Sequence, residues 1–222
     1  MLNNMYYPAM LDLRNRTCLV VGGGKVAARK LRKLVKCGAH VKVLSPELGE
    51  EITRLLTGKP YTGRKVEWIK DRYSKSYLEG VFMCFVCTDD AAVNRKAAAD
   101  AAEAGVLVNA ADDPGASSFV VPAVRREGSI TVAVGCCDNP AASRYIADLL
   151  IKGLEPWIPE YVDFVSDIRK KCRGLIADSR ARQAFMKRLF GDEFIGIARK
   201  DMAAARYEAY KLLEEYAKKA GD

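Results

Sequence analysis

A glycine turn between a strand-like run and a helix-like segment limits the fold of this 222-residue chain more than any other feature. The apolar run Thr17–Val21 ends in three consecutive glycines, residues 22–24, and residues 25–37 then have the periodicity of an amphipathic helix. Strand-like and helix-like stretches keep alternating through the first hundred residues, which is typical of parallel sheets. The sequence therefore predicts an α/β fold of the Rossmann type, a doubly wound parallel sheet. Further strands are expected at 41–44, 66–69, 81–86 and 106–109, with helices at 47–56 and 91–104.

The glycine turn and the residues after it match the pattern G-x-G-x-x-A, which binds dinucleotides when it joins a strand to a helix. Gly22 permits the tight turn, Gly24 lets a pyrophosphate approach the backbone, and Ala27 lets the helix pack closely on the sheet. Free N–H groups at the start of the helix then face the phosphates. A purely structural turn is the alternative, because tight turns need glycine in any case.

The end of the second strand bears on which dinucleotide is bound. A carboxylate for the ribose is usual there, whereas this chain has Ser45, Pro46 and Glu47. The Ser45 hydroxyl can form a hydrogen bond with the ribose, and no arginine follows the strand to hold a 2′-phosphate. We therefore expect NAD rather than NADP as the cofactor. The expected cofactor-binding residues are Gly22, Gly23, Gly24, Lys25, Val26, Ser45, Pro46 and, at the end of the fourth strand, Thr88.

The pattern changes after Pro114. Two strand-like runs, 117–122 and 129–134, have no long helix between them and predict a hairpin-like unit outside the first fold. From Pro140 onward the chain is mostly helical, with breaks expected at Pro156, Pro159, Gly174 and Gly191. We therefore expect an NAD-binding domain over residues 1–113, a small strand-containing region over 114–147 and a helical domain over 148–222.

Composition and cysteine usage exclude several classes of protein. Half of the residues are apolar and 29% are charged, with a net charge of +8, as in ordinary globular proteins and unlike disordered chains. The longest apolar run, Val81–Cys87, is far shorter than the roughly 20 residues of a membrane span. The first residues lack the pattern of a signal peptide, and seven cysteines at this length suggest reduced thiols. We therefore expect a cytoplasmic protein with no membrane partner.

Metal-binding chemistry has little support in the sequence. Cys84 and Cys87 have the spacing of a metal or redox pair, but a strand would point them to opposite faces, which favours core packing. The single histidine, His40, leaves little scope for a histidine-based metal site or a catalytic triad. No metal site is therefore expected.

Several further motifs, in order along the chain, resemble the precorrin-2 dehydrogenases. This family includes the N-terminal module of siroheme synthases and the bifunctional dehydrogenase–ferrochelatases. The resemblance covers residues 6–150 well and the helical remainder loosely. The motifs that carry it are Tyr7–Leu13, Cys18–Lys30, Gly38–Val43, Cys87–Asp90, Asn109–Pro114 and Ser118–Ala123.

The resemblance implies a Rossmann domain, a small dimerisation region and a helical domain, in a homodimer that binds a tetrapyrrole between its domains. It implies NAD-dependent oxidation of precorrin-2 to sirohydrochlorin, and in some members the insertion of ferrous iron to give siroheme. The alternative from another class is a non-catalytic NAD-sensing Rossmann regulator, which needs no carboxylate beside the nicotinamide.

The family's essential aspartate falls on Asp112. A carboxylate suits dehydrogenation, which sends a hydride to the nicotinamide and a proton to a base. Asp112 also lies just beyond the carboxyl end of a predicted parallel strand, where such sheets bind ligands. The alternative is that Asp112 or Asp113 only caps a turn before Pro114, as Asp89 or Asp90 can cap the next helix. We expect Asp112 to be catalytic and Asn109, Ser118 and Cys136 to contact the substrate.

One segment departs from the family pattern. The family commonly has a serine- and glycine-containing turn where this chain reads Gly135–Pro140. Cys136 falls where a family serine lies near the tetrapyrrole, so the departure bears on how the macrocycle is held and on ferrochelatase activity. Cys136 and Cys137 are either metal-responsive or simply small turn residues.

Residues 169–188 carry eight basic side chains and one acid, Asp178. A solvated helix face is one interpretation, and a wall that binds the carboxylates of the tetrapyrrole is another. Nucleic acid is the third, but the chain contains no recognised nucleic-acid module, so no nucleic-acid partner is expected. The basic residues are Arg169, Lys170, Lys171, Arg173, Arg180, Arg182, Lys187 and Arg188.

Overall fold

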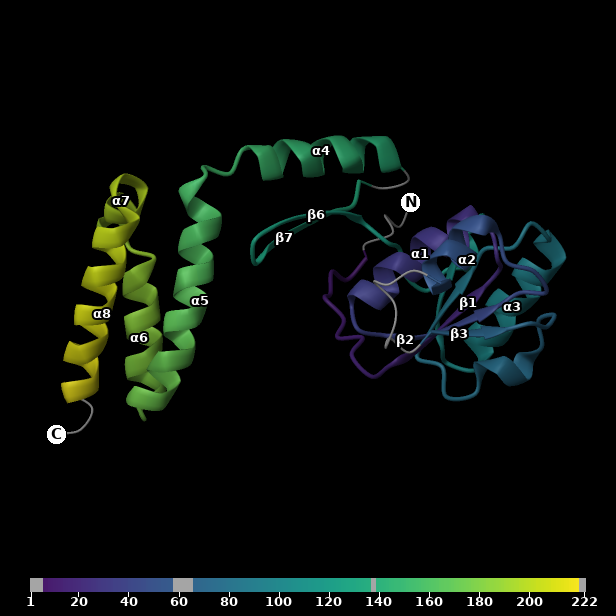
Figure 1. The fold of residues 1–222 in the computed structure, drawn as a ribbon, viewed down its shortest axis with the longest axis horizontal. Helices are drawn as coiled ribbons and strands as arrows, with labels where there is room; N and C mark the ends of the chain where they lie inside the picture. The colour runs from purple at the N-terminus through teal and green to yellow at the C-terminus, as the bar shows by residue number, and fades with distance from the viewer. Residues whose placement is uncertain (1–5, 58–65, 137–138, 220–222) are drawn as a thin grey trace. The chain divides into compact units, whose positions relative to one another are not determined.

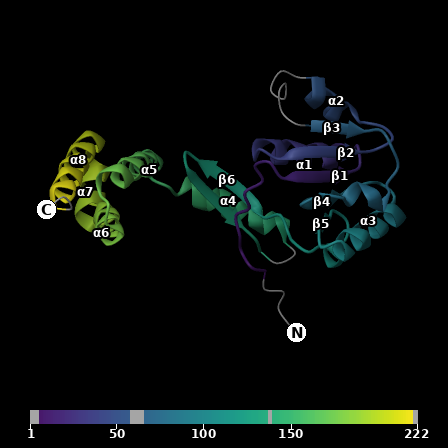
Figure 2. The same ribbon diagram turned by 90° about the horizontal axis from the view of Figure 1, so that it is seen from below.

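The computed structural model describes residues 6–57, 66–136 and 139–219. The chain divides into two compact units, Met1–Val120 and Val121–Asp222, whose helices and strands are labelled between them in Figure 1 and Figure 2.

The first unit is built on a five-stranded sheet in the order β3-β2-β1-β4-β5, which Figure 2 shows from one strand to the next. All four strand pairs are parallel, so the predicted doubly wound parallel sheet is confirmed. The order places the first strand between the second and the fourth, so the loops after these three strands meet at one edge of the sheet. The strands are β1 (Thr17–Val21), β2 (His40–Leu44), β3 (Val66–Ile69), β4 (Met83–Val86) and β5 (Leu107–Ala110).

Helices cover both faces of this sheet (Figure 1). The helices α1 (Lys25–Lys36) and α2 (Glu50–Thr57) pack on one face, and α3 (Ala91–Glu103) packs on the other. Successive side chains of β1 point to opposite faces of the sheet: Val20 belongs to the apolar cluster on the α1 side and Val21 to the one on the α3 side. A strand buried on both sides must be apolar throughout, which explains why β1 and β4 are unbroken apolar runs.

The cysteines at the end of β4 pack as predicted. Cys84 belongs to the α3-side cluster and Cys87 to the α1-side cluster, so the two thiols lie on opposite faces. Burial raises the pKa of Cys84 to about 12 and that of Cys87 to about 11. Cys18 on β1 is also buried, and its pKa is likewise raised to about 11. These thiols are protonated core side chains at neutral pH, and the described residues contain no cluster of metal-ligating groups.

Two predicted elements of the first unit were misplaced. The helix expected at 47–56 begins only at Glu50, because the loop before it is bonded to the glycine turn through Gly49 N–H and Gly23 O, 2.9 Å apart. The strand expected at 117–122 is absent: Ser117 and Ser118 instead use their hydroxyls to accept the backbone N–H groups of β5. The chain therefore stays attached to the first unit beyond residue 113.

The second unit begins with the antiparallel hairpin of β6 (Ala123–Glu127) and β7 (Ile130–Val134). The hairpin was predicted, but its first strand lies six residues later than expected. Gly128 adopts a left-handed φ of 53° in the tight turn between the strands. Helix α4 (Pro140–Lys152) packs on the hairpin, and Arg125 of β6 forms a paired salt bridge with Asp148 of α4.

The rest of the second unit is helical, as predicted, and has its own apolar core. The expected breaks at Pro156 and Gly191 are confirmed, since these residues immediately precede α5 and α7. The expected break at Pro159 was wrong, whereas α5 does end one residue after Gly174, at Leu175. Pro159 occupies the first turn of α5, where no N–H donor is needed, and Gly174 lies in its last turn. The helices are α5 (Trp157–Leu175), α6 (Ser179–Leu189), α7 (Asp192–Lys200) and α8 (Met202–Lys219). Among the described residues no helix has the length and apolarity to cross a bilayer.

Candidate functional site

The glycine turn after β1 is tightly enclosed at two positions and open at the third. Gly22 has a φ of +123°, and a Cβ there would lie 2.5 Å from the carbonyl oxygen of Cys87. A Cβ on Gly23 would lie 2.1 Å from the carbonyl oxygen of Glu47. A Cβ on Gly24 would meet nothing within 4 Å. Packing therefore requires the first two glycines, whereas the third keeps a space beside the backbone free.

The start of α1 adjoins that free space. Gly24 is the N-cap residue, with no side chain bonded to the cap and no acidic residue in the first turn. The first N–H groups of a helix have no partner within the helix, so those at Lys25 and Val26 face outward. Ala27 is fully buried against the sheet, which confirms the close packing expected of it. This combination is suited to an anionic group such as a pyrophosphate.

The loop after β2 lies against the glycine turn. The Ser45 hydroxyl donates to the carbonyl of Glu47 at 2.6 Å, and a Cβ on Gly23 would be 2.7 Å from the Ser45 oxygen. The hydroxyl proton of Ser45 is therefore engaged, but its oxygen can still accept a hydrogen bond. Pro46 is exposed beside it. The predicted residues of the glycine turn and of this loop are thus brought together.

The end of β4 lies on the other side of the glycine turn. A Cβ on Gly22 would lie 3.2 Å from the backbone nitrogen of Thr88, so Thr88 adjoins the turn as predicted. Its hydroxyl donates to Asn94 Oδ1 at 2.6 Å and accepts from the N–H of Asp90. Of the two aspartates considered as helix caps, it is Asp90 that caps α3, by accepting the N–H groups of residues 92 and 93.

The two aspartates after β5 have different roles. Asp113 Oδ1 accepts the N–H groups of Gly115 and Ala116 and so caps a short 3-10 turn, η3 (Pro114–Ala116). Asp112 caps nothing among the described residues: its Oδ2 accepts from Asn94 Nδ2 at 2.9 Å. The turn-cap alternative therefore applies to Asp113, while the carboxylate of Asp112 is exposed beyond the carboxyl end of β5.

Asn94 is a polar residue of the site that sequence reasoning missed. Its side chain is buried, with 3% exposed, and it contacts both Thr88 and Asp112. Helix α3 is so rich in alanine that the sequence gives no clear inward face. One sequence feature could have identified it: Asn94 is an amide six residues after Thr88, in the first turn of a helix that begins at the edge of the sheet.

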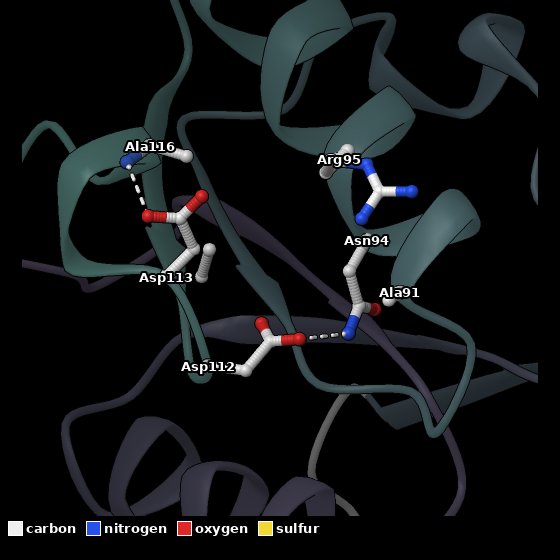
Figure 3. A pocket seen from close by; sticks show the side chains of 7 residues that line it. Ala91, Asn94, Arg95, Asp112, Asp113 and Ala116 are labelled. Atoms are coloured by element: carbon white, nitrogen blue, oxygen red, sulfur yellow. Dashed lines mark hydrogen bonds between the residues drawn. The ribbon is translucent and has the colours of Figure 1, made fainter.

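A small pocket of about 200 Å³ lies between α3 and the segment after β5. Figure 3 shows Asp112 and Asp113 on one side and Arg95 on the other, with Asn94 bonded to Asp112. The pocket therefore presents acidic, amide and guanidinium groups to any ligand. Its lining residues are Ala91, Asn94, Arg95, Ala110, Asp112, Asp113 and Ala116.

Asn109 and Ser118, two of the expected substrate contacts, are bonded within the first unit. Asn109 accepts from Lys30 Nζ at 2.9 Å and donates to the carbonyl of Phe119 at 3.1 Å. The Ser118 hydroxyl accepts the N–H of Val108 at 2.8 Å. These bonds hold the chain after β5 against the sheet, and a substrate contact by either residue stays a prediction.

Lys30 is less exposed than its place on a charged helix suggested. Its ammonium lies 4.7 Å from the centre of the Phe85 ring and contacts Asn109. Burial lowers the pKa of Lys30 to about 8, and the neighbouring charges of Arg29 and Lys33 act in the same direction. The lysine is therefore held where its charge is poorly solvated.

Cys136, the third expected substrate contact, lies in the second unit. Its N–H donates to the hydroxyl of Ser143 and its carbonyl accepts the N–H of Asn139, which caps α4. Cys137 and Asp138 lie outside the described residues. The backbone of Cys136 thus has a turn role, and its contact with substrate stays a prediction.

The basic side chains of residues 169–188 divide into two groups. Lys170 pairs with Asp167, Lys171 lies over the ring of Tyr210, Arg182 donates to two carbonyls at the end of α5, and Arg188 is 3.9 Å from Glu193. The side chains of the other four form no hydrogen bond, ion pair or ring contact in the part of the chain that the structure describes. These are Arg169, Arg173, Arg180 and Lys187.

Comparison with known proteins agrees with this geometry. A family described as "Putative NAD(P)-binding" matches residues 9–123. Siroheme synthase of Chromobacterium violaceum is 35% identical over 210 residues, 94% of this chain and 44% of that protein. Siroheme synthase of Nitrosomonas europaea is 32% identical over 91% of this chain and 42% of its own length. The chain therefore spans less than half the length of these relatives.

A solved structure titled "SirC, precorrin-2 dehydrogenase" shares the fold. Its TM-score is 0.76, with 23% identity over 95% of this chain and all of that one. The family match covers the glycine turn, the loop after β2, Thr88 and Asp112. On its sequence and on the geometry of the turn, this chain belongs to that NAD(P)-binding family.

Proposed function

We propose that this protein oxidises precorrin-2 to sirohydrochlorin in the cytoplasm, with NAD as the hydride acceptor and Asp112 as the base. The observation that carries the proposal is the exposed carboxylate of Asp112, held by one oxygen beyond the carboxyl end of β5. Asn94 links it to Thr88, which adjoins the glycine turn. The siroheme synthase relatives supply the substrate class. The six described cysteines are all free thiols, which fits a reducing compartment.

The dinucleotide would be held by the glycine turn and the start of α1. Gly24 leaves room for the pyrophosphate, and the N–H groups of Lys25 and Val26 would donate to it. Ser45 would accept a hydrogen bond from the ribose, and Thr88 would lie along the cofactor near Gly22. The loop after β2 carries no arginine that could hold a 2′-phosphate, which favours NAD over NADP.

In this reaction the protein itself has to carry out one step, the removal of a proton from the substrate. When bound, the nicotinamide accepts a hydride from the substrate, and a second hydrogen must leave that substrate as a proton. Asp112 can accept it, because its Oδ2 is engaged by Asn94 while its Oδ1 has no hydrogen-bond partner among the described residues. A non-catalytic NAD sensor would have no use for a carboxylate held in this way.

The second unit supports a homodimer as part of the same proposal. Tyr145 and Leu149 lie one turn apart on α4 and are 68% and 56% exposed, and Leu150 is half exposed. Large apolar side chains gathered on one helix are typical of a protein interface. Cys136, Asn109 and Ser118 remain proposed substrate contacts, and the four unpaired basic residues of α5 and α6 are candidates for binding substrate carboxylates.

The test is an anaerobic assay with enzymatically generated precorrin-2, following NADH and the sirohydrochlorin spectrum. We expect Asp112→Ala to lose NADH formation at least 100-fold while its circular dichroism stays unchanged. Asp100→Asn, on α3 with contacts to Tyr73 and Lys96, is the matched control. Full activity in folded Asp112→Ala would overturn the catalytic assignment. Replacing NAD by NADP tests the cofactor, and adding ferrous iron afterwards tests the predicted ferrochelatase step.

A further inference from the structure

Asn94 makes the largest possible number of hydrogen bonds for an amide. Its Oδ1 accepts the N–H of Thr88 at 3.1 Å and the hydroxyl of Thr88 at 2.6 Å. Its Nδ2 donates to the carbonyl of Thr88 at 2.9 Å and to Asp112 Oδ2 at 2.9 Å. Two lone pairs and two N–H groups are thus all engaged, and the side chain is 3% exposed.

The orientation of this amide follows from its neighbours. A backbone N–H can only donate, so the atom of Asn94 that faces Thr88 N must be the oxygen. The nitrogen then faces Asp112, and a carboxylate oxygen there can accept its proton. A flipped amide would oppose donor to donor at Thr88 and acceptor to acceptor at Asp112. The direction of the bond to Asp112 is therefore fixed by the backbone at the end of β4.

Asp112 itself is exposed and lies two residues beyond the end of β5, so its backbone alone leaves the carboxylate free to rotate. The bond from Asn94 is the only one that the described residues make to this carboxylate. It engages Oδ2, as Figure 3 shows, and leaves Oδ1 without a hydrogen-bond partner among the described residues.

We propose that Asn94 is the positioning residue of this site: it orients the Asp112 carboxylate and ties it to Thr88 at the cofactor turn. The inference rests on the proposed role of Asp112 as the base. Misplacing a reacting group by an ångström can lower a rate about 100-fold, so one buried amide can matter as much as a catalytic group.

The first test is Asn94→Asp, which keeps the shape and the oxygen that accepts from the N–H and hydroxyl of Thr88. It replaces Nδ2, the donor to Asp112 and to the Thr88 carbonyl, by a second carboxylate oxygen. We expect kcat to fall at least ten-fold, with a smaller change in the KM for NAD. Two adjacent carboxylates titrate as a coupled pair, so the acidic limb of the pH–rate profile should move at least one unit upward. The other charged or ionisable groups around Asp112 stay in place in this variant. They are Arg95 and Asp113, which line the pocket, and the Cys87 thiol at the end of β4, which interacts electrostatically with Asp112.

A second variant separates position from charge. Asn94→Ser is too short to reach Asp112 and adds no carboxylate, so kcat should fall at least ten-fold while the acidic limb of the pH–rate profile moves much less than in Asn94→Asp. Asp100→Asn on the same helix is again the control and should keep wild-type kcat and profile. Circular dichroism and thermal melting establish that each variant is folded. If Asn94→Asp does not fold, Asn94→Ser alone decides.

The outcomes distinguish this inference from the proposed function. Wild-type kcat in folded Asn94→Ser would overturn the positioning role of Asn94, and so would a normal kcat with an unmoved pH–rate profile in Asn94→Asp. Loss of activity in Asp112→Ala would in that case still support Asp112 as the base. Full activity in Asp112→Ala would remove the base and the positioning role with it.

Discussion

Lys30 offers a prediction whose size follows from the structure. Its pKa is lowered from 10.5 to about 8, mainly because the ammonium is buried beside Phe85. A pKa unit is worth about 1.4 kcal/mol, so the charged lysine disfavours the native state by about 3 kcal/mol relative to an unperturbed one. Between pH 8 and 10.5 the unfolded chain binds more protons at this residue than the native chain. The free energy of unfolding should therefore rise with pH in that window.

The comparison is with Lys30→Met, which keeps an unbranched side chain beside Phe85 and has no charge. The difference in unfolding free energy, wild type minus variant, should be constant below pH 7.5 and increase by about 2.5 kcal/mol by pH 10. Other ionisations occur in both proteins and cancel. The series stops at pH 10 because the pKa of the neighbouring Cys87 thiol is about 11.

The two compact units need not unfold together, so the readout must belong to the first unit. The chain has two tryptophans, Trp68 on β3 and Trp157 on α5. In a Trp157→Phe background, the fluorescence of Trp68 during urea unfolding reports the sheet alone. A difference that stays level from pH 7 to 10 would refute the argument, and a falling one would mean that Asn109 and Phe85 stabilise the charge.

The remaining predictions concern the glycine turn and the apolar face of α4. Gly24→Ala should change the unfolding free energy by no more than about 1 kcal/mol, since its Cβ meets nothing, yet weaken NAD binding at least ten-fold by calorimetry. Gly22→Ala should lose about 3 kcal/mol or more in the Trp68 assay, through its φ of +123° and the contact with Cys87. Equal NAD affinity in Gly24→Ala would mean that the open space is not the pyrophosphate site. Leu149→Glu should convert a dimer to a monomer in sedimentation at micromolar concentration, and a monomeric wild type would contradict the interface.

The sheet and its helices were predictable because each is encoded locally. The alternation of apolar runs and amphipathic stretches was enough for β1 to β5, and the glycine pattern located the cofactor turn. The first hairpin strand was misplaced because Ser117 and Ser118 look like strand residues, whereas their hydroxyls bond to β5, some ten residues away. Sequence patterns record how apolar a segment is but not which backbone groups its side chains will bond.

The position of Asp112 in the candidate site could be predicted from the sequence, whereas that of Asn94 could not. Asp112 could be placed because parallel strands deliver their following residues to one sheet edge. Which aspartate caps a turn, Asp112 or Asp113, depends on where η3 begins, and the start of η3 depends on tertiary contacts. Asn94 was hidden for the same reason: in a helix made largely of alanine, only the packed structure shows that this amide faces inward.

Each unit contains at least one buried cysteine whose reactivity can report the local unfolding of that unit. Cys18, Cys84 and Cys87 are shielded in the layers of the sheet, and Cys172 is shielded in the helical core. A thiol that is protonated and enclosed reacts with an alkylating reagent only when its surroundings open. Mass spectrometry of timed alkylation would therefore measure the local unfolding of the first unit and of the second unit in the same sample of wild-type protein. NAD added to that sample should slow the first set of thiols, since a ligand stabilises the unit that binds it.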